Sequence, residues 1–183
     1  MMYLPKTIVC DLRAFWRDDE ANATVEFVLI APMLFWLVFS VFEAGWLMTR
    51  QMMLERGLDL MVRDLRIGVY GPNPSHSTLK SNVCRYAKVF KDCENSVHLE
   101  LAVLDRNSLG LANTSEIGCV DRSGAVSPVL KLNPGARSDI MFVRACMVVD
   151  PLLPGTGLGA QLTKDPTGGF AMVAYGAFVN EPP

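Results

Sequence analysis

The sequence is poor in the groups that catalysis and nucleic-acid binding require. Only 2 of its 183 residues are histidine, charged residues make up 20% of it, and the formal net charge at pH 7 is -2. Without a basic excess the chain offers little attraction to a phosphate backbone, which argues against nucleic acid as a partner. It also lacks a glycine-rich phosphate loop, a metalloprotease helix motif and a nucleophile elbow. We therefore expect no enzyme, no cofactor and no metal site.

Apolar residues, in contrast, are abundant and unevenly placed. The 16 residues from Phe27 to Phe42 contain no charge, and after Glu43 the apolar pattern resumes as far as Met48. About 22 helical residues span roughly 33 Å, enough to cross a bilayer core of about 30 Å. A buried core helix usually shows a polar stripe, and this run has none. We predict a transmembrane helix over residues 22–48.

A cleaved secretory signal is a poor explanation for this apolar run. The run is preceded by 26 residues that include Asp18, Asp19 and Glu20. The amino-terminal region of a signal peptide is instead short and basic, and a small-x-small cleavage site follows its apolar stretch. Cleavage after Ala44 would place Phe42 at a position that needs a small residue. We therefore expect the span to be retained.

The cysteines indicate which side of the membrane the larger part occupies. One cysteine precedes the span and four follow it: Cys10, and then Cys84, Cys93, Cys119 and Cys146. An even number beyond the span suits two disulfides in an oxidising compartment, with the lone thiol in the reducing cytosol. Short loops favour the pairs Cys84–Cys93 and Cys119–Cys146, although spacing leaves the two other pairings open. A rival interpretation, zinc held by His76, Cys84, Cys93 and His98, lacks the close ligand pairs of zinc motifs.

The rest of the chain alternates between helical and strand periodicity. The expected elements are a continuation of the span over residues 49–67, a helix over 78–91, and strands over 97–103, 140–149 and 170–179. His98 is expected to point outward from the first strand. Residues 107–135 and 151–169 are rich in loop formers, and we predict loops there. The fold class is α+β, with a small antiparallel sheet on a helical stem.

Two acidic residues border the apolar run. Glu26 begins it, either as an acid near the helix start at headgroup level or as a carboxylate that enters hydrocarbon. In hydrocarbon it would need a partner, and a new amino terminus on a neighbouring chain would neutralise both charges. Glu43 is interpreted as an interfacial residue near the outer end of the span.

These residues carry a resemblance to a known family. The segment from Phe15 to Pro32 reads FWRDDEANATVEFVLIAP. It resembles the amino-terminal signature of the TadE family, the minor pilin-like (pseudopilin) proteins of the tight-adherence (Flp, type IVc) pilus system. Glu43-Ala44-Gly45 is similar to the Glu-x-Gly turn that ends the family's apolar run. The resemblance is specific over about 35 residues.

The resemblance implies processing and assembly at the amino terminus. A prepilin peptidase would remove a cytoplasmic leader, residues 1–21, by cutting between Ala21 and Asn22. Ala21 stands where the family usually has glycine. Glu26 would become the fifth residue of the mature chain, and with Phe27 it would act in assembly. The fold implied is a long transmembrane helix continuing into a pilin-like domain, residues 49–183, in the periplasm.

The function implied is that of a minor pilin-like subunit that primes, caps or is incorporated into a Flp/Tad-type pilus. Its partners would be other pilin-like subunits through the helix, the prepilin peptidase, the inner-membrane assembly platform and membrane lipid. The protein would be a single-pass protein of the bacterial inner membrane with a cytoplasmic amino terminus, able to enter the extracellular pilus. The alternative is an unprocessed inner-membrane anchor that recruits pilus or secretion components through its periplasmic domain.

Overall fold

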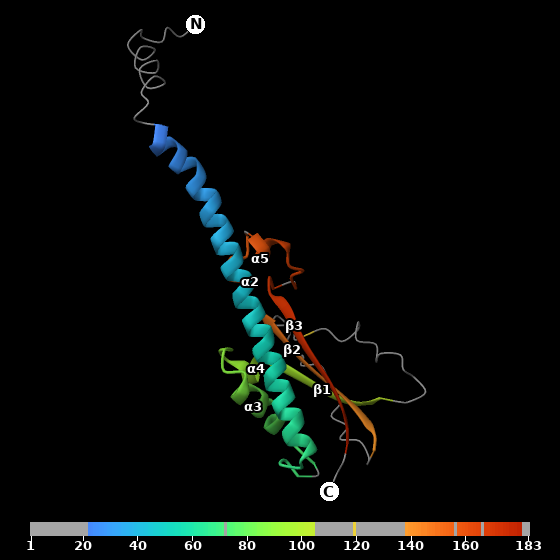
Figure 1. The fold of residues 1–183 in the computed structure, drawn as a ribbon. Coiled ribbons are helices and arrows are strands. Elements are labelled where there is room, and N and C mark those ends of the chain that lie inside the picture. Colours follow the sequence, from blue (N-terminus) through green and yellow to red (C-terminus); the bar gives the residue numbers. More distant parts are fainter. Residues whose placement is uncertain are drawn as a thin grey trace, which may run out of the picture. The chain divides into compact units, whose positions relative to one another are not determined.

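The structure, a computed structural model, describes residues 22–71, 73–104, 119, 138–155, 157–165 and 167–180. The chain divides into two compact units, residues 1–42 and residues 43–183. One helix, α2 (Asn22–Arg66), contributes to both of them (Figure 1). The predicted leader, residues 1–21, and nearly all of the predicted loop at 107–135 lie outside the described residues.

The second unit contains short helices and one sheet. After α2 come α3 (His76–Tyr86), α4 (Cys93–Ser96), β1 (Val97–Leu104), β2 (Ile140–Val149), α5 (Gly157–Gln161) and β3 (Phe170–Val179). The strands form an antiparallel sheet in the order β1-β2-β3. β2 is central and is buried along nearly its whole length, in agreement with its apolar sequence. The fold is therefore a long apolar helix followed by an α+β domain, which confirms the predicted class.

The core lies between α2 and one face of the sheet. Leu54, Leu58 and Met61 recur at helical spacing and are at most 1% exposed. They meet the face of the sheet on which alternate residues of all three strands point inward. The largest of these are Leu99, Leu101, Met141, Met147, Met172 and Phe178. Gly176 lies so close to α2 that an added Cβ would be 4.0 Å from Leu58.

Helix α3 packs against α2 and β1, and it is shorter at its carboxyl end than predicted. Ser75 caps its start by accepting a hydrogen bond from the Thr78 amide (3.1 Å). At its end, Ala87 donates a hydrogen bond to the Val83 carbonyl and leaves the helical conformation. Ala87 is fully buried against Gly57 of α2, so the chain turns there instead of continuing to residue 91. The separate helix α4 follows.

Two expectations about the second unit are wrong. Residues 151–169, predicted as loop throughout, contain α5, a five-residue helix whose two glycines gave no helical signal. His98 does not point outward into solvent but is 7% exposed. It lies opposite Cys146 on the second face of the sheet, and that cysteine is bonded to Cys119. Burial, with smaller contributions from the charges of Lys80 and His76, lowers the His98 pKa to about 4.

Candidate functional site

The first part of α2 exposes almost all of its apolar side chains. Phe27 is 69% exposed, Met33 76% and Trp36 59%. The helix is long and apolar enough to cross a membrane. Its most apolar window of 18 residues has a mean hydropathy of 2.3, and none of that window is buried. A core helix of similar composition would be mostly buried. Continuous apolar exposure on this scale marks a surface that contacts lipid or other proteins.

Two hydroxyl groups within and just beyond this apolar surface are hydrogen-bonded inside the helix. The Ser40 hydroxyl donates to the Trp36 carbonyl (2.9 Å), and the Thr49 hydroxyl donates to the Gly45 carbonyl (2.8 Å). Pro32 lies inside the helix, where it removes one backbone donor. Proline is tolerated in membrane helices more readily than in soluble ones, because neighbouring groups compensate. The polar content of this segment therefore fits an apolar environment.

Glu26 and Phe27 lie near the start of α2, and both are exposed. Asn22 is the first residue of the helix, whereas Ala21 lies outside the described residues. Among the described residues, Glu26 makes no hydrogen bond or ion pair within this chain. A carboxylate on an otherwise apolar helix costs a few kcal/mol in hydrocarbon unless it is paired. A partner for Glu26 in hydrocarbon would therefore have to lie outside the part of the chain that the structure describes.

Glu43, which was expected near the outer end of the span, is not on the surface but is buried, with 1% of the residue exposed. Its carboxylate accepts hydrogen bonds from two backbone amides, Leu153 N–H at 2.8 Å and Gly159 N–H at 3.0 Å. A buried carboxylate is stable only when such donors replace its lost water. A Cβ added at Gly159 would lie 2.9 Å from the Glu43 Oε1 atom and 2.3 Å from the Leu153 carbonyl oxygen, so glycine permits this approach. Glu43 therefore fastens residues 153–159 to α2.

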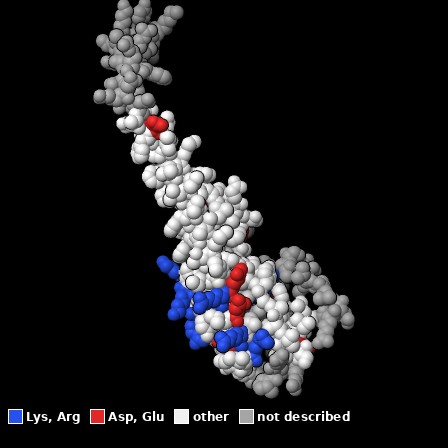
Figure 2. All heavy atoms as spheres, viewed as in Figure 1, with Lys and Arg blue, Asp and Glu red and all other residues white. Residues whose placement is uncertain are grey.

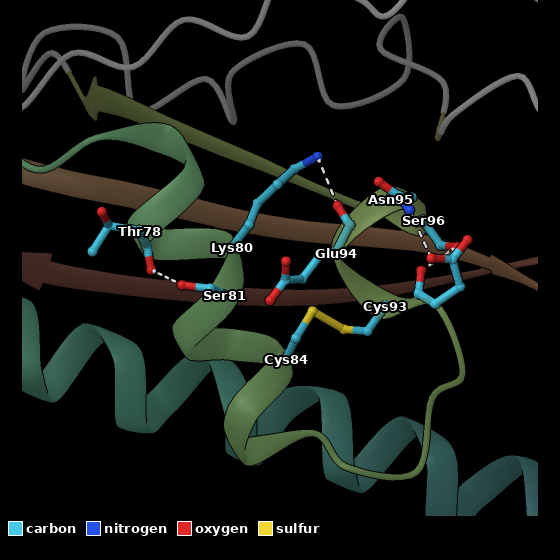
Figure 3. Close-up of a disulfide and its surroundings, with 9 residues drawn as sticks. Thr78, Lys80, Ser81, Cys84, Cys93, Glu94, Asn95 and Ser96 are labelled. Carbon is cyan, nitrogen blue, oxygen red and sulfur yellow. Dashed lines mark hydrogen bonds between the residues drawn. A yellow bond between two sulfur atoms is a disulfide. The ribbon is translucent and has the colours of Figure 1, made fainter.

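The four cysteines of the second unit form two disulfides, in the pairing that short loops favour. Cys84 of α3 is bonded to Cys93 of α4, with their Cα atoms 5.7 Å apart (Figure 3). Cys119 is bonded to Cys146 of β2. Cys84 and Cys93 are thus unavailable as thiolates, which removes the rival zinc interpretation. No cluster of three or more metal-ligating side chains occurs among the described residues.

Charge separates the two parts of the chain. In Figure 2 the visible face of the amino-terminal part of α2 is almost wholly uncharged, while Lys and Arg gather over the second unit beside a smaller acidic group. One cation-bearing contact lies close to Glu43 in sequence. The Arg50 guanidinium stacks over the Trp46 ring at 5.1 Å and donates to the Asp150 carbonyl at 3.3 Å. This pairing of an aromatic ring with a cation is common where a protein meets a membrane surface.

The chain therefore combines an exposed apolar helix, long enough to cross a membrane, with a disulfide-bonded α+β unit. Residues 22–59 match the family model of the TadE-like proteins, so the chain contains a TadE-like domain there. Neither the curated proteins nor the solved structures include a match to this chain.

The match covers some predicted site residues and not others. Glu26 and Phe27 lie within it, whereas Ala21 lies just before it. The residue whose local role the sequence did not reveal is Glu43, since the amides that it binds come from positions 110 and 116 residues later. Its only sequence signal was an acid that interrupts an apolar helix, a position where an unpaired charge is costly.

Proposed function

We propose that this chain is a minor pilin-like subunit that primes, caps or is incorporated into a Tad-type pilus. The observation that carries the proposal is the exposed apolar part of α2, which lies within the TadE-like match and is joined to a folded α+β unit. The helix would pack against the helices of other pilin-like subunits. The inner-membrane assembly platform and a prepilin peptidase would be its other partners.

The membrane span is proposed to be residues 22–48 and to stay attached to the domain. A secretory peptidase acting near Ala44 would cut inside α2. The next turns of that helix carry Leu47 and Leu54, which are 6% and 0% exposed in the core. Cleavage there would remove the start of a helix on which the domain folds. A cut at the far end of α2, before Asn22, leaves the core intact and supports a leader of residues 1–21 instead.

The proposed topology places the leader in the cytoplasm and residues 49–183 in the periplasm. Two disulfides in the second unit support this, because such bonds persist in oxidising compartments and are rare in the cytosol. After assembly the same domain would be carried outside the cell with the pilus.

The role proposed for Glu26 is to bind the new amino terminus of a neighbouring subunit. Cleavage between Ala21 and Asn22 would expose an α-amine one helical turn before Glu26. An opposite charge within hydrogen-bonding distance offsets the cost of placing either group in hydrocarbon. The pairing would therefore fix the register between adjacent helices, while Phe27 and the other apolar side chains supply packing.

Sequencing the amino terminus of the protein from native membranes tests processing directly. The proposal predicts a mature chain that begins at Asn22. A chain that retains its first 21 residues while pili assemble normally would contradict it. Replacing Ala21 with arginine should block the cut, because the peptidase pocket accepts a small residue. The variant should then accumulate at full length in the membrane.

Glu26→Ala separates the pilin-like role from that of an unprocessed anchor. The proposal predicts normal membrane insertion and loss of pilus incorporation, measured by fractionation and by immunoblotting of sheared pili. Asp59→Ala is the matched control, since Asp59 is an exposed acid on the same helix outside the apolar part. An anchor that acts only through its domain would tolerate both substitutions equally well.

A further inference from the structure

A second apolar surface lies on the loop that Glu43 holds. We name residues 151–161 the clamp loop. Its sequence, PLLPGTGLGAQ, contains no charged residue. Three of its leucines are exposed although the domain has a well-packed core: Leu152 by 48%, Leu153 by 37% and Leu158 by 37%. Three partly exposed leucines on one short uncharged segment form an apolar patch that a contact outside the domain could cover.

The position of the clamp loop along α2 identifies that contact. Glu43 is the residue after Phe42, where the uncharged run ends. Its carboxylate lies within 3.0 Å of the Leu153 and Gly159 amides, so the loop is held at the level where the proposed span leaves the bilayer. In Figure 1, α5 lies beside α2, in agreement with these hydrogen bonds.

We infer that the clamp loop is a membrane-interface contact, in which Leu152, Leu153 and Leu158 insert among the lipid headgroups and upper acyl chains. The inference rests on the proposed role of α2 as a membrane span. An irregular backbone stays out of hydrocarbon, where its amides would lack partners. At the headgroup level water remains available, and apolar side chains there enter the boundary by about 5–10 Å.

The residues around the clamp loop fit a lipid surface better than a protein partner. Arg50 binds the Asp150 carbonyl, and Lys164 donates to the Pro154 carbonyl, so a cation borders the loop on each side. Cations at the edge of an apolar contact attract anionic headgroups and extend their apolar stems beside the acyl chains. Trp46, one turn after Glu43, adds the aromatic ring that is typical of this depth.

Depth-dependent fluorescence quenching in vesicles tests the inference on the full-length chain. Cys10→Ser provides a background with both disulfides intact, and Leu158→Cys carries a bimane label. The vesicles contain phosphatidylcholine and phosphatidylglycerol, with nitroxide either on the headgroup or deep in the acyl chain. The label at residue 158 should be quenched several-fold more by the headgroup nitroxide than by the deep one. A label at Leu152→Cys provides a second position should the first disturb folding.

Two control labels make the outcomes distinguishable. Lys88→Cys is an exposed position far from the proposed interface. Its neighbour Ala87 packs at Gly57. Gly57 lies about 21 Å along α2 from Glu43. This label should be quenched by neither nitroxide. Phe35→Cys lies within the proposed span and should be quenched by the deep nitroxide. Quenching at 35 without quenching at 158 or 152 overturns the inference alone, whereas absence of quenching at 35 overturns the membrane span as well.

Crosslinking in the same vesicles tests the competing occupant. If a second copy of the chain covered the clamp loop, the unlabelled Leu158→Cys variant would form disulfide-linked dimers under mild oxidation. In the labelled sample, the bimane at residue 158 would then be shielded from the headgroup nitroxide. That result overturns the inference. Monomers together with headgroup quenching support it.

Discussion

The two parts of α2 both carry many apolar side chains but differ in what covers them. In residues 23–42 the apolar side chains are exposed around the whole helix, as at Phe27 (69%) and Leu29 (68%). In residues 43–66 one face is covered by the sheet, and Leu54 and Leu58 are at most 1% exposed. Hydrogen-bonded helical backbone is continuous through both parts. The environment therefore changes along α2 without any change in secondary structure.

The difference shows that the position of charged side chains around an apolar helix decides which of its faces meets water and which meets a core. The second part carries exposed charged residues on the side away from the sheet: Glu55, Arg56, Asp59, Arg63 and Arg66. Such a stripe lets one face meet water while the other meets a core. The first part has no such stripe, so its own domain cannot complete it. It needs lipid or other helices on all sides.

The largest expected effect is that of a cavity in the second part of α2. Leu58→Ala removes a side chain that is 1% exposed and should lower the free energy of unfolding of the domain by about 3 kcal/mol. Leu34→Ala makes the same chemical change where the residue is 58% exposed. It should change the free energy of unfolding by less than about 0.5 kcal/mol. Guanidinium unfolding in detergent micelles, followed by near-UV circular dichroism, measures both. If both variants lost the same free energy of unfolding, the two parts of α2 would not differ in how they are packed.

The next effect concerns the boundary between the parts. Glu43→Ala leaves the Leu153 and Gly159 amides without their acceptor, and should cost about 2 kcal/mol. Hydrogen exchange should show loss of protection at these two amides before any change in the sheet. Glu55→Ala is the control, because Glu55 is exposed and accepts a hydrogen bond only from the Gln51 side chain. Retained protection at residues 153 and 159 would show that other contacts hold the clamp loop.

The elements of this fold were predictable where a pattern repeats along the chain. The long apolar run identified α2, the alternation in residues 97–103 identified β1, and the short apolar run IMFVRACMVV identified the central strand β2. The pairing of Cys84 with Cys93 was favoured by a separation of 9 residues. Glu26 and Phe27 were singled out because they lie in an amino-terminal signature, part of which the TadE-like match covers, and their role stays a prediction.

Long-range contacts were not predictable in this way. Glu43 looked interfacial because its neighbours are apolar, and nothing nearby shows that residues 153 and 159 supply its donors. His98 looked exposed because it alternates with Val97 and Leu99, a pattern typical of a sheet with one solvated face. The second face is covered at His98 and Cys146, and alternation within one strand cannot report that.

The pH dependence of stability should come from the domain and include His98. Its pKa is about 4 in the folded chain and near 6.5 when unfolded, so the unfolded state binds the proton first as the pH falls. This contribution is complete above about pH 7 and decreases towards pH 4. The free energy of unfolding should fall by about 1 kcal/mol from this group between pH 7 and pH 5.5. His98→Leu should remove that part of the slope in denaturant titrations at the two pH values. An unchanged slope would show that other groups cause it.

The smallest effect uses two glycines on α2 to separate helix propensity from packing. At Gly45 an added Cβ has no atom within 4 Å, so Gly45→Ala should stabilise the helix by up to about 1 kcal/mol. At Gly57 the Cβ would lie 2.9 Å from the Val83 carbonyl oxygen and 3.1 Å from the Ala87 Cβ. The same gain in propensity is then opposed by overpacking of about 1–3 kcal/mol, so Gly57→Ala should be neutral or destabilising.

Thermal unfolding of the two variants in the same micelles measures the sign of each change. The Cys84–Cys93 disulfide fixes the carboxyl end of α3 near Ala87, so that end has little freedom to move away from a new methyl group at residue 57. Reducing that disulfide should relieve part of the Gly57→Ala penalty and leave the Gly45→Ala gain unchanged. If both variants were stabilised equally, α3 would be able to yield, and the close approach at Gly57 would not be what stops the helix at Tyr86.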